Sequence, residues 1–447
     1  MRLIRPLRPH VLFLTVASLL AVACGASSQN AATSPAVTSA PRSGTSAESS
    51  VAPPPRALLA VGRAGESGLE VIETDRSDPA LRMPLGVPDT DWVHILTTVP
   101  DGTGTIVRNR QFGDDTGPEV RLDGQWRLPT IGGDALPVGR SLNGSTAVLV
   151  EDRGPGYGAT IATRFALLRI DGDGSPRLLR TLQLKGAFEF DALSPTGSVL
   201  YLVEHLDPGN GGRYQVRSMD IAASALDATP ITDKRLIDEP MAGVPITQLR
   251  RADGLVMTLY RGAEHPFVHV LNSVDRWAVC LDLPANGADD PAAALDWGLA
   301  ETSDARTVYA VNATLGLVVE ISPADLTVRR TARLSASTAA GPAIVLAKFG
   351  HADSEPVGRR AAVAPDGATI VAGGARGVVG IAAKDLSVAW RALDGQAVGG
   401  LALTRDGTSV FALLVTGRIV ALSTSDGSSR GAVPGVGYDR LVAITGG

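Results

Sequence analysis

The chain has 447 residues and a formal net charge of −5 at pH 7. Because proteins that bind nucleic acid carry a basic surface, this balance argues against a nucleic-acid partner. Hydrophobic residues make up 44% of the chain, enough to bury a core, and the 50 glycines and 29 prolines favour short strands and many turns over long helices.

Residues 1–23 have the organisation of an export signal. Three arginines, at positions 2, 5 and 8, give a positive start, and an almost unbroken apolar run follows from Val11 to Leu20. This run is shorter than the roughly 20 residues that a transmembrane helix needs. It therefore predicts a cleaved signal peptide and an exported protein.

The residues Ala21-Val-Ala-Cys-Gly25 stand at the predicted cleavage point and resemble the lipobox of bacterial lipoproteins. In that family the cysteine thiol is linked to diacylglycerol and the cysteine becomes the new N-terminus. The family prefers Leu where this chain has Ala21, and the small residues before Cys24 also satisfy the rule for ordinary secretory cleavage. The resemblance implies lipid attachment at Cys24 and a place on the outer face of the cell membrane, with a secreted protein as the alternative.

Residues 24–55 are predicted to form a tether behind the lipidated cysteine. From Gly25 to Pro55 the chain consists almost wholly of Ser, Ala, Thr, Pro and Gly, a composition that cannot bury a core. A released protein has less need of such a spacer, so the tether favours the lipoprotein over the secreted form.

From residue 56 to residue 447 one unit recurs: an apolar strand, a tight turn containing Asp, Asn or Gly, and a second strand of alternating apolar residues. The turns recur at intervals of 40 to 62 residues with a mean near 51, which fits one four-stranded propeller blade. They end at Gly102, Gly144, Gly197, Gly254, Ala305, Gly367 and Gly407.

Glycine suits these turns because a two-residue hairpin connection needs positive φ, which Gly, Asn and Asp tolerate. Ala305 departs from that preference. The corner Ser303-Asp-Ala-Arg306 is therefore expected to use a different turn type.

Three stretches of the chain carry a family pattern. The turn Pro365-Asp-Gly367, the strand Val308-Tyr-Ala-Val-Asn312 and the strand Leu317-Val-Val-Glu-Ile321 resemble the YVTN family of β-propeller repeats. The match is good over residues 300–430 and degenerate over residues 57–300. It implies a propeller, and lactone-cleaving and quinone-dependent enzymes occur among propellers similar to this one.

The two ends of the repeat region complete each other. Leu58–Val61 and Leu69–Ile72 have the pattern of a second and a third strand without a first, and Arg440–Ile444 has the pattern of a first strand without a successor. We therefore predict an all-β fold: a single β-propeller of eight four-stranded blades, with seven as the alternative, closed by pairing the N- and C-terminal strands. A long loop is expected from Gly341 to Pro356. A two-domain β-sandwich would not explain one spacing across the whole region.

Candidate catalytic and metal-binding residues are sparse. His265 and His269 share one face of a predicted strand but stand about 13 Å apart there, too far for one zinc, so the histidines are assigned surface or loop roles. Cys280, inside a predicted strand, is interpreted as a packed thiol, and the acidic turn Asp171-Gly-Asp-Gly174 as a hairpin connection. The five tryptophans are assigned to packing between blades. No catalytic residue, metal or cofactor is predicted.

The leading hypothesis is a monomeric cell-envelope lipoprotein, held to the membrane by its N-terminal lipid, whose propeller binds a protein, peptide or glycan. The alternative is a hydrolase of lactonase-like type with an active site at the axial opening. That alternative requires Glu, Asp, His or Asn side chains to converge there.

Overall fold

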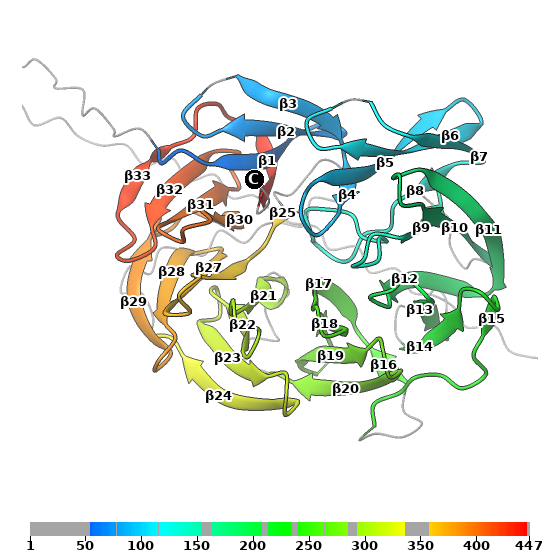
Figure 1. The fold of residues 1–447 in the computed structure, drawn as a ribbon. Helices are drawn as coiled ribbons and strands as arrows, with labels where there is room; N and C mark the ends of the chain where they lie inside the picture. The colour runs from blue at the N-terminus through cyan, green and yellow to red at the C-terminus, as the bar shows by residue number, and fades with distance from the viewer. Residues whose placement is uncertain are drawn as a thin grey trace, which may run out of the picture. The chain divides into compact units, whose positions relative to one another are not determined.

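The strands of this protein are arranged in sheets around a common axis (Figure 1). The computed structural model describes residues 54–76, 78–114, 116–152, 162–207, 213–234, 240–262, 264–284, 293–335 and 357–444. These residues form eight four-stranded antiparallel blades in a ring (Figure 1). The predicted all-β propeller and the preferred count of eight are confirmed. The predicted signal peptide, Cys24, almost all of the tether and the loop Gly341–Pro356 lie outside the described residues. No helix in the described part is long and apolar enough to cross a membrane.

Blade 1 joins the two ends of the propeller. Its strands run in the order β34 (Tyr438–Ala443), β1 (Leu58–Arg63), β2 (Gly68–Glu73) and β3 (Pro79–Pro84), and β25 (Val357–Gly358) pairs in parallel with β34. In register, Val61 lies opposite Leu441, and both side chains are at most 1% exposed. The predicted closure is confirmed, and it removes two strand edges that would otherwise be open to pairing with other chains.

The other blades follow in chain order. Blade 2 contains β4 (Gly86–Pro88), β5 (His94–Asp101), β6 (Gly104–Gln111) and β7 (Glu119–Asp123); blade 3 contains β8 (Trp126–Arg127), β9 (Thr146–Glu151), β10 (Ala162–Ile170) and β11 (Pro176–Lys185); blade 4 contains β12 (Ala187–Leu193), β13 (Val199–His205), β14 (Arg213–Asp220) and β15 (Ala225–Leu226), with β16 (Met241–Ala242) also paired to β14.

Blade 5 contains β17 (Val244–Arg250), β18 (Leu255–Arg261), β19 (Pro266–Asn272) and β20 (Trp277–Asp282). The short 3-10 helix η1 (Ala293–Leu295) precedes blade 6, which contains β21 (Trp297–Glu301), β22 (Val308–Asn312), β23 (Leu317–Ser322) and β24 (Thr327–Arg333). Blade 7 contains β26 (Ala361–Val363), β27 (Thr369–Gly374), β28 (Gly377–Ala382) and β29 (Ser387–Ala392), and blade 8 contains β30 (Val398–Leu403), β31 (Ser409–Leu414), β32 (Ile419–Ser423) and β33 (Ser429–Ala432). The first strand of each blade lies nearest the axis and the last at the rim (Figure 1).

The same type of turn joins the first and second strands of most blades. In blade 7, the N–H of Gly367 donates to the carbonyl of Ala364 at 2.8 Å, and the N–H of Ala368 donates to Oδ1 of Asp366 at 2.9 Å. Gly367 has φ +71°, in the left-handed region that glycine enters without steric cost. The short polar side chain thus completes a turn that the local sequence specifies.

Ala305 occupies the same position in blade 6, and the different turn type expected there is wrong. Its N–H donates to the carbonyl of Thr302 at 2.8 Å, the N–H of Arg306 donates to Asp304 at 3.1 Å, and φ of Ala305 is +57°. The turn is the same as in the other blades, since tertiary pairing of the flanking strands overrides the preference of alanine.

The core lies between neighbouring blades. Side chains of blades 5 and 6, for example Met257, Val268 and Trp297, pack into one apolar cluster that is almost fully excluded from solvent. The predicted packing role is confirmed for four tryptophans, which are at most 8% exposed: Trp92, Trp126, Trp297 and Trp390. The fifth, Trp277, is partly buried beneath Lys234, whose Nζ lies 4.0 Å from the ring centre.

Candidate functional site

A loop from blade 3 reaches the innermost strand of blade 5. The loop lies between β8 and β9, and its Asp134 accepts a hydrogen bond from Oγ1 of Thr247 at 2.6 Å and one from the N–H of Gln248 at 3.2 Å. The N–H of Gly133 donates to the carbonyl of Ile246 at 2.9 Å. The loop therefore crosses the inner side of the ring, because blade 4 stands between blade 3 and blade 5.

A second carboxyl group lies beside this contact. Asp191 is on β12, the innermost strand of blade 4, and is 1% exposed. The side-chain amide of Gln248 donates to the Asp191 carbonyl at 3.1 Å, to Asp191 Oδ1 at 3.4 Å and to Thr258 Oγ1 at 3.0 Å. Gln248 thus joins Asp134, through its backbone, to Asp191, through its side chain.

The environment changes the pKa of both carboxyl groups. Burial raises the pKa of Asp191 to about 7. Burial also raises the pKa of Asp134 to about 6, against the opposing effect of its hydrogen bonds to Thr247 and Gln248. Within the described residues, Oδ2 of Asp191 has no hydrogen-bond partner. Two carboxyl groups with raised pKa values therefore lie on either side of Gln248, on the inner side of blades 4 and 5.

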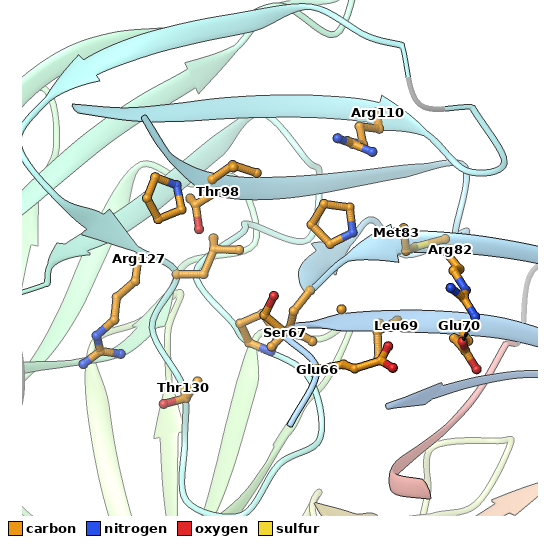
Figure 2. Close-up of a pocket in the computed structure, with 17 residues that line it drawn as sticks. Glu66, Ser67, Leu69, Glu70, Arg82, Met83, Thr98, Arg110, Arg127 and Thr130 are labelled. Carbon is orange, nitrogen blue, oxygen red and sulfur yellow. Dashed lines mark ion pairs between the residues drawn. The ribbon is translucent and has the colours of Figure 1, made fainter. Parts of the chain in front are cut away.

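A groove opens between blades 1 and 2 (Figure 2). Its volume is about 700 Å³. Strands β2, β3, β5 and β6 and the loop between β8 and β9 supply its walls. The apolar residues of these walls are Leu69, Met83, Pro84, Leu85, Val99, Pro100, Leu128 and Pro137. Its charged members are Glu66, Glu70, Arg82, Arg110 and Arg127.

The two ends of the groove differ in how their charges are paired. At one end, the carboxylate of Glu70 forms ion pairs with Arg63 at 2.6 Å and with Arg82 at 2.9 Å, and the Glu70 side chain is only 4% exposed. At the other end lies Arg127 (Figure 2), whose exposed side chain makes no hydrogen bond or ion pair with any described residue and whose charge helps to lower the pKa of Glu189 on β12. A cationic group at the edge of an apolar groove can receive an anionic group of a ligand.

No protein-family model matches the sequence, and a comparison with curated proteins finds no match. Among solved structures, the chain is similar to dihydro-heme d1 dehydrogenase NirN in complex with DHE, at 13% identity and a TM-score of 0.53, over 87% of this chain and 75% of that one. This likeness supports the propeller fold alone.

Two further structures resemble the chain more weakly. A putative 6-phosphogluconolactonase from Bacteroides fragilis has 16% identity and a TM-score of 0.42, over 80% of this chain and 99% of that one. The periplasmic gluconolactonase PpgL of Pseudomonas aeruginosa has 16% identity and a TM-score of 0.43, over 87% and 100%. Neither is close enough to bear on the function of this chain.

The structure separates the two histidines that the sequence analysis paired. His265 is half-exposed, with Nε2 3.0 Å from Asp282, but His269 on β19 is fully buried, so its predicted surface role is wrong. Burial lowers the pKa of His269 to about 4.

The acidic turn at Asp171 is a hairpin connection between β10 and β11, as predicted.

Sequence reasoning missed Asp134, Asp191 and Arg127. Asp134 and Arg127 lie in a stretch without regular alternation, and Asp191 stands within an apolar strand at a bulge, where the register shifts between Phe190 and Ala192. Two acids, Glu189 and Asp191, inside an otherwise apolar segment were the one signal available for Asp191. In the described residues, no group of three or more His, Cys, Asp or Glu side chains is placed to hold a metal ion.

Proposed function

We propose that this chain is a cell-envelope lipoprotein, anchored through Cys24, whose propeller binds an acidic, partly apolar peptide segment of another envelope protein. The observation that carries the proposal is the groove between blades 1 and 2, with the unpaired Arg127 at its end. The anchor, the tether of residues 24–55 and a rigid ring would present that groove to partners at the membrane surface.

The groove fits a peptide in size and chemistry. A volume of about 700 Å³ accommodates a few side chains, and its leucine, methionine, valine and proline walls favour apolar ones. Three arginines (Arg82, Arg110 and Arg127) line it against two glutamates, so the local charge favours an acidic ligand although the whole chain is acidic.

A glycan is the less suitable occupant. Sugar rings commonly stack their apolar face on an aromatic side chain, and no aromatic residue is among the described residues that line the groove. Binding of an acidic peptide should depend on Arg127, whereas binding of a neutral glycan should not.

The test is affinity capture from detergent-solubilised envelopes with the full lipidated chain. The wild type should enrich one partner protein reproducibly, and Arg127→Glu should weaken binding of that partner about 10-fold to 30-fold, because a charged contact is lost and a like charge replaces it. The matched control is Arg306→Glu, an equal charge change at an arginine whose side chain is 85% exposed on blade 6. Capture of no partner under several growth conditions, or a partner held equally by Arg127→Glu, would reject the proposal.

The anchor is tested separately. Cys24→Ala should move the protein from the membrane fraction to the soluble fraction and leave capture through the groove unchanged. A wild-type protein that is already soluble after export would instead favour the secreted form.

The two axial acids favour a second candidate, a hydrolase of lactonase-like type. A carboxyl group with a pKa of about 7, the value to which burial raises that of Asp191, can act as a general acid near neutral pH. Wild-type protein should then open at least one ring ester in a panel of lactones, and Asp191→Asn should lower that rate at least about 100-fold. No turnover of the panel by the wild type would remove this candidate.

A further inference from the structure

Three donor atoms that bind soft metals meet between blades 4 and 5. Sγ of Cys280, on β20, lies 3.6 Å from Sδ of Met241, on β16, and 3.7 Å from Nδ1 of His269, on β19. We call Met241, His269 and Cys280 the sulfur–imidazole triad. Its members come from three strands, and only His269 and Cys280 are cross-strand neighbours.

The two separations from Cys280 Sγ are close to those between ligands of one metal ion. With metal–sulfur bonds of about 2.3 Å and a metal–nitrogen bond of about 2.0 Å, trigonal coordination places two sulfurs about 4.0 Å apart and sulfur and nitrogen about 3.7 Å apart. The observed sulfur–nitrogen distance already equals the second value, and the two sulfurs need to separate by a few tenths of an ångström. The unbranched Met241 side chain can supply that adjustment by rotating.

His269 is an unusual residue for a purely apolar interior. It is 0% exposed, and Tyr260 stands edge-on with ring centres 6.3 Å apart. Its Nδ1 faces Cys280 Sγ, whereas its Nε2 has no hydrogen-bond partner among the described residues.

The surroundings select a soft, singly charged ion. Thiolate and thioether ligands together favour Cu(I) over harder metals. One thiolate neutralises one positive charge, so a Cu(I) complex would carry no net charge into the core cluster that contains Tyr214, Tyr260 and Phe267. The neighbouring carboxylate of Asp233 is not counted among the ligands, because its Oδ2 accepts a hydrogen bond from the backbone N–H of Cys280 at 2.8 Å.

We propose that Met241, His269 and Cys280 form a Cu(I)-binding site, independent of the groove between blades 1 and 2. On binding, the Cys280 thiol loses its proton to water as the sulfur–copper bond forms, and no electron is transferred. Cys280 is partly exposed. A rim groove of about 600 Å³, lined mainly by residues 227–234 together with Arg276 and Trp277, includes Asp233, which accepts the backbone N–H of Cys280.

The experiment is an anaerobic titration of the full chain with Cu(I), using bicinchoninate as the competing chelator. One Cu(I) per chain should bind. Cys280→Ser should weaken binding more than about 100-fold, since even groups that only support metal ligands are worth about 10-fold to 100-fold. Met241→Leu keeps the side-chain volume and should weaken binding about 10-fold. The matched control is Cys24→Ser, which removes the other cysteine of the chain and should change neither affinity nor stoichiometry.

X-ray absorption at the copper edge of the wild-type protein provides a second readout that needs no variant. It should show two sulfur ligands and one nitrogen ligand. Copper with nitrogen and oxygen ligands alone, or equal affinity in Cys280→Ser with unchanged thermal unfolding, would overturn the proposal. Tighter binding of Zn²⁺ than of Cu(I) to the same three residues would overturn the assignment of the ion.

Discussion

Replacing Ala305 by glycine tests whether this turn stores backbone strain. Ala305 has φ +57°, whereas the equivalent residues of five other blades are glycines with φ between +68° and +87°. A residue with a Cβ costs about 1–2 kcal/mol in this region. Glycine avoids that cost but loses about 0.5–1 kcal/mol because it restricts the unfolded chain less. The difference predicts that Ala305→Gly stabilises the protein by about 0.5–1 kcal/mol.

The sister turns offer matched controls. At Gly367 an added Cβ would meet no atom within 4 Å, so Gly367→Ala should introduce the backbone strain alone and destabilise by about 0.5–1 kcal/mol. At Gly407 an added Cβ would lie 2.2 Å from Cδ of Pro365, so Gly407→Ala should cost a further 1–3 kcal/mol or so through overpacking.

The assay is urea unfolding followed by tryptophan fluorescence, with the free energy of unfolding compared among the three variants and the wild type. The expected order of stability is Ala305→Gly, wild type, Gly367→Ala and Gly407→Ala. A less stable Ala305→Gly protein would refute the reasoning. It would mean that contacts of the Ala305 backbone, such as the hydrogen bond from Arg251 Nη2 to its carbonyl at 2.9 Å, depend on the alanine.

Three further outcomes are expected. Asp191 has a folded-state pKa of about 7 against an ordinary 3.8, so the folded protein keeps a proton that the unfolded chain releases. Stability should therefore fall by about 2 kcal/mol from pH 5 to pH 7, and urea titrations at the two pH values should show that Asp191→Asn removes this fall. Leu441→Ala, in the strand that closes the ring, should lower the free energy of unfolding by about 2–5 kcal/mol, whereas Val436→Ala, at a side chain 62% exposed, should change it by less than about 0.5. Glu301→Ala should lower the free energy of unfolding by about 2 kcal/mol in the same assay, because it removes an ion-pair partner from Arg251, whose side chain is 5% exposed. An unchanged free energy of unfolding would show that the remaining partners of Arg251 suffice.

The candidate sites were far less predictable than the fold. The groove depends on Arg127, which the sequence places in an irregular stretch between two blades. Asp134 and Thr247 are 113 residues apart in the chain, and their hydrogen bond forms only because a loop crosses the inside of the ring. Cys280 was interpreted correctly as a packed thiol, but the sequence did not show that Met241 and His269 would pack against it.

The sequence by itself determined the architecture: the recurring turns, the eight blades and the pairing of Leu58–Arg63 with the C-terminal strand. These features could be predicted because strand alternation and turn chemistry act over a few residues and repeat along the chain. Only the tertiary structure decided that Ala305 takes a left-handed conformation, that His269 is buried and which side chains meet between blades. Such contacts join residues from different blades, and their geometry depends on how the sheets pack around the axis, which local periodicity does not specify.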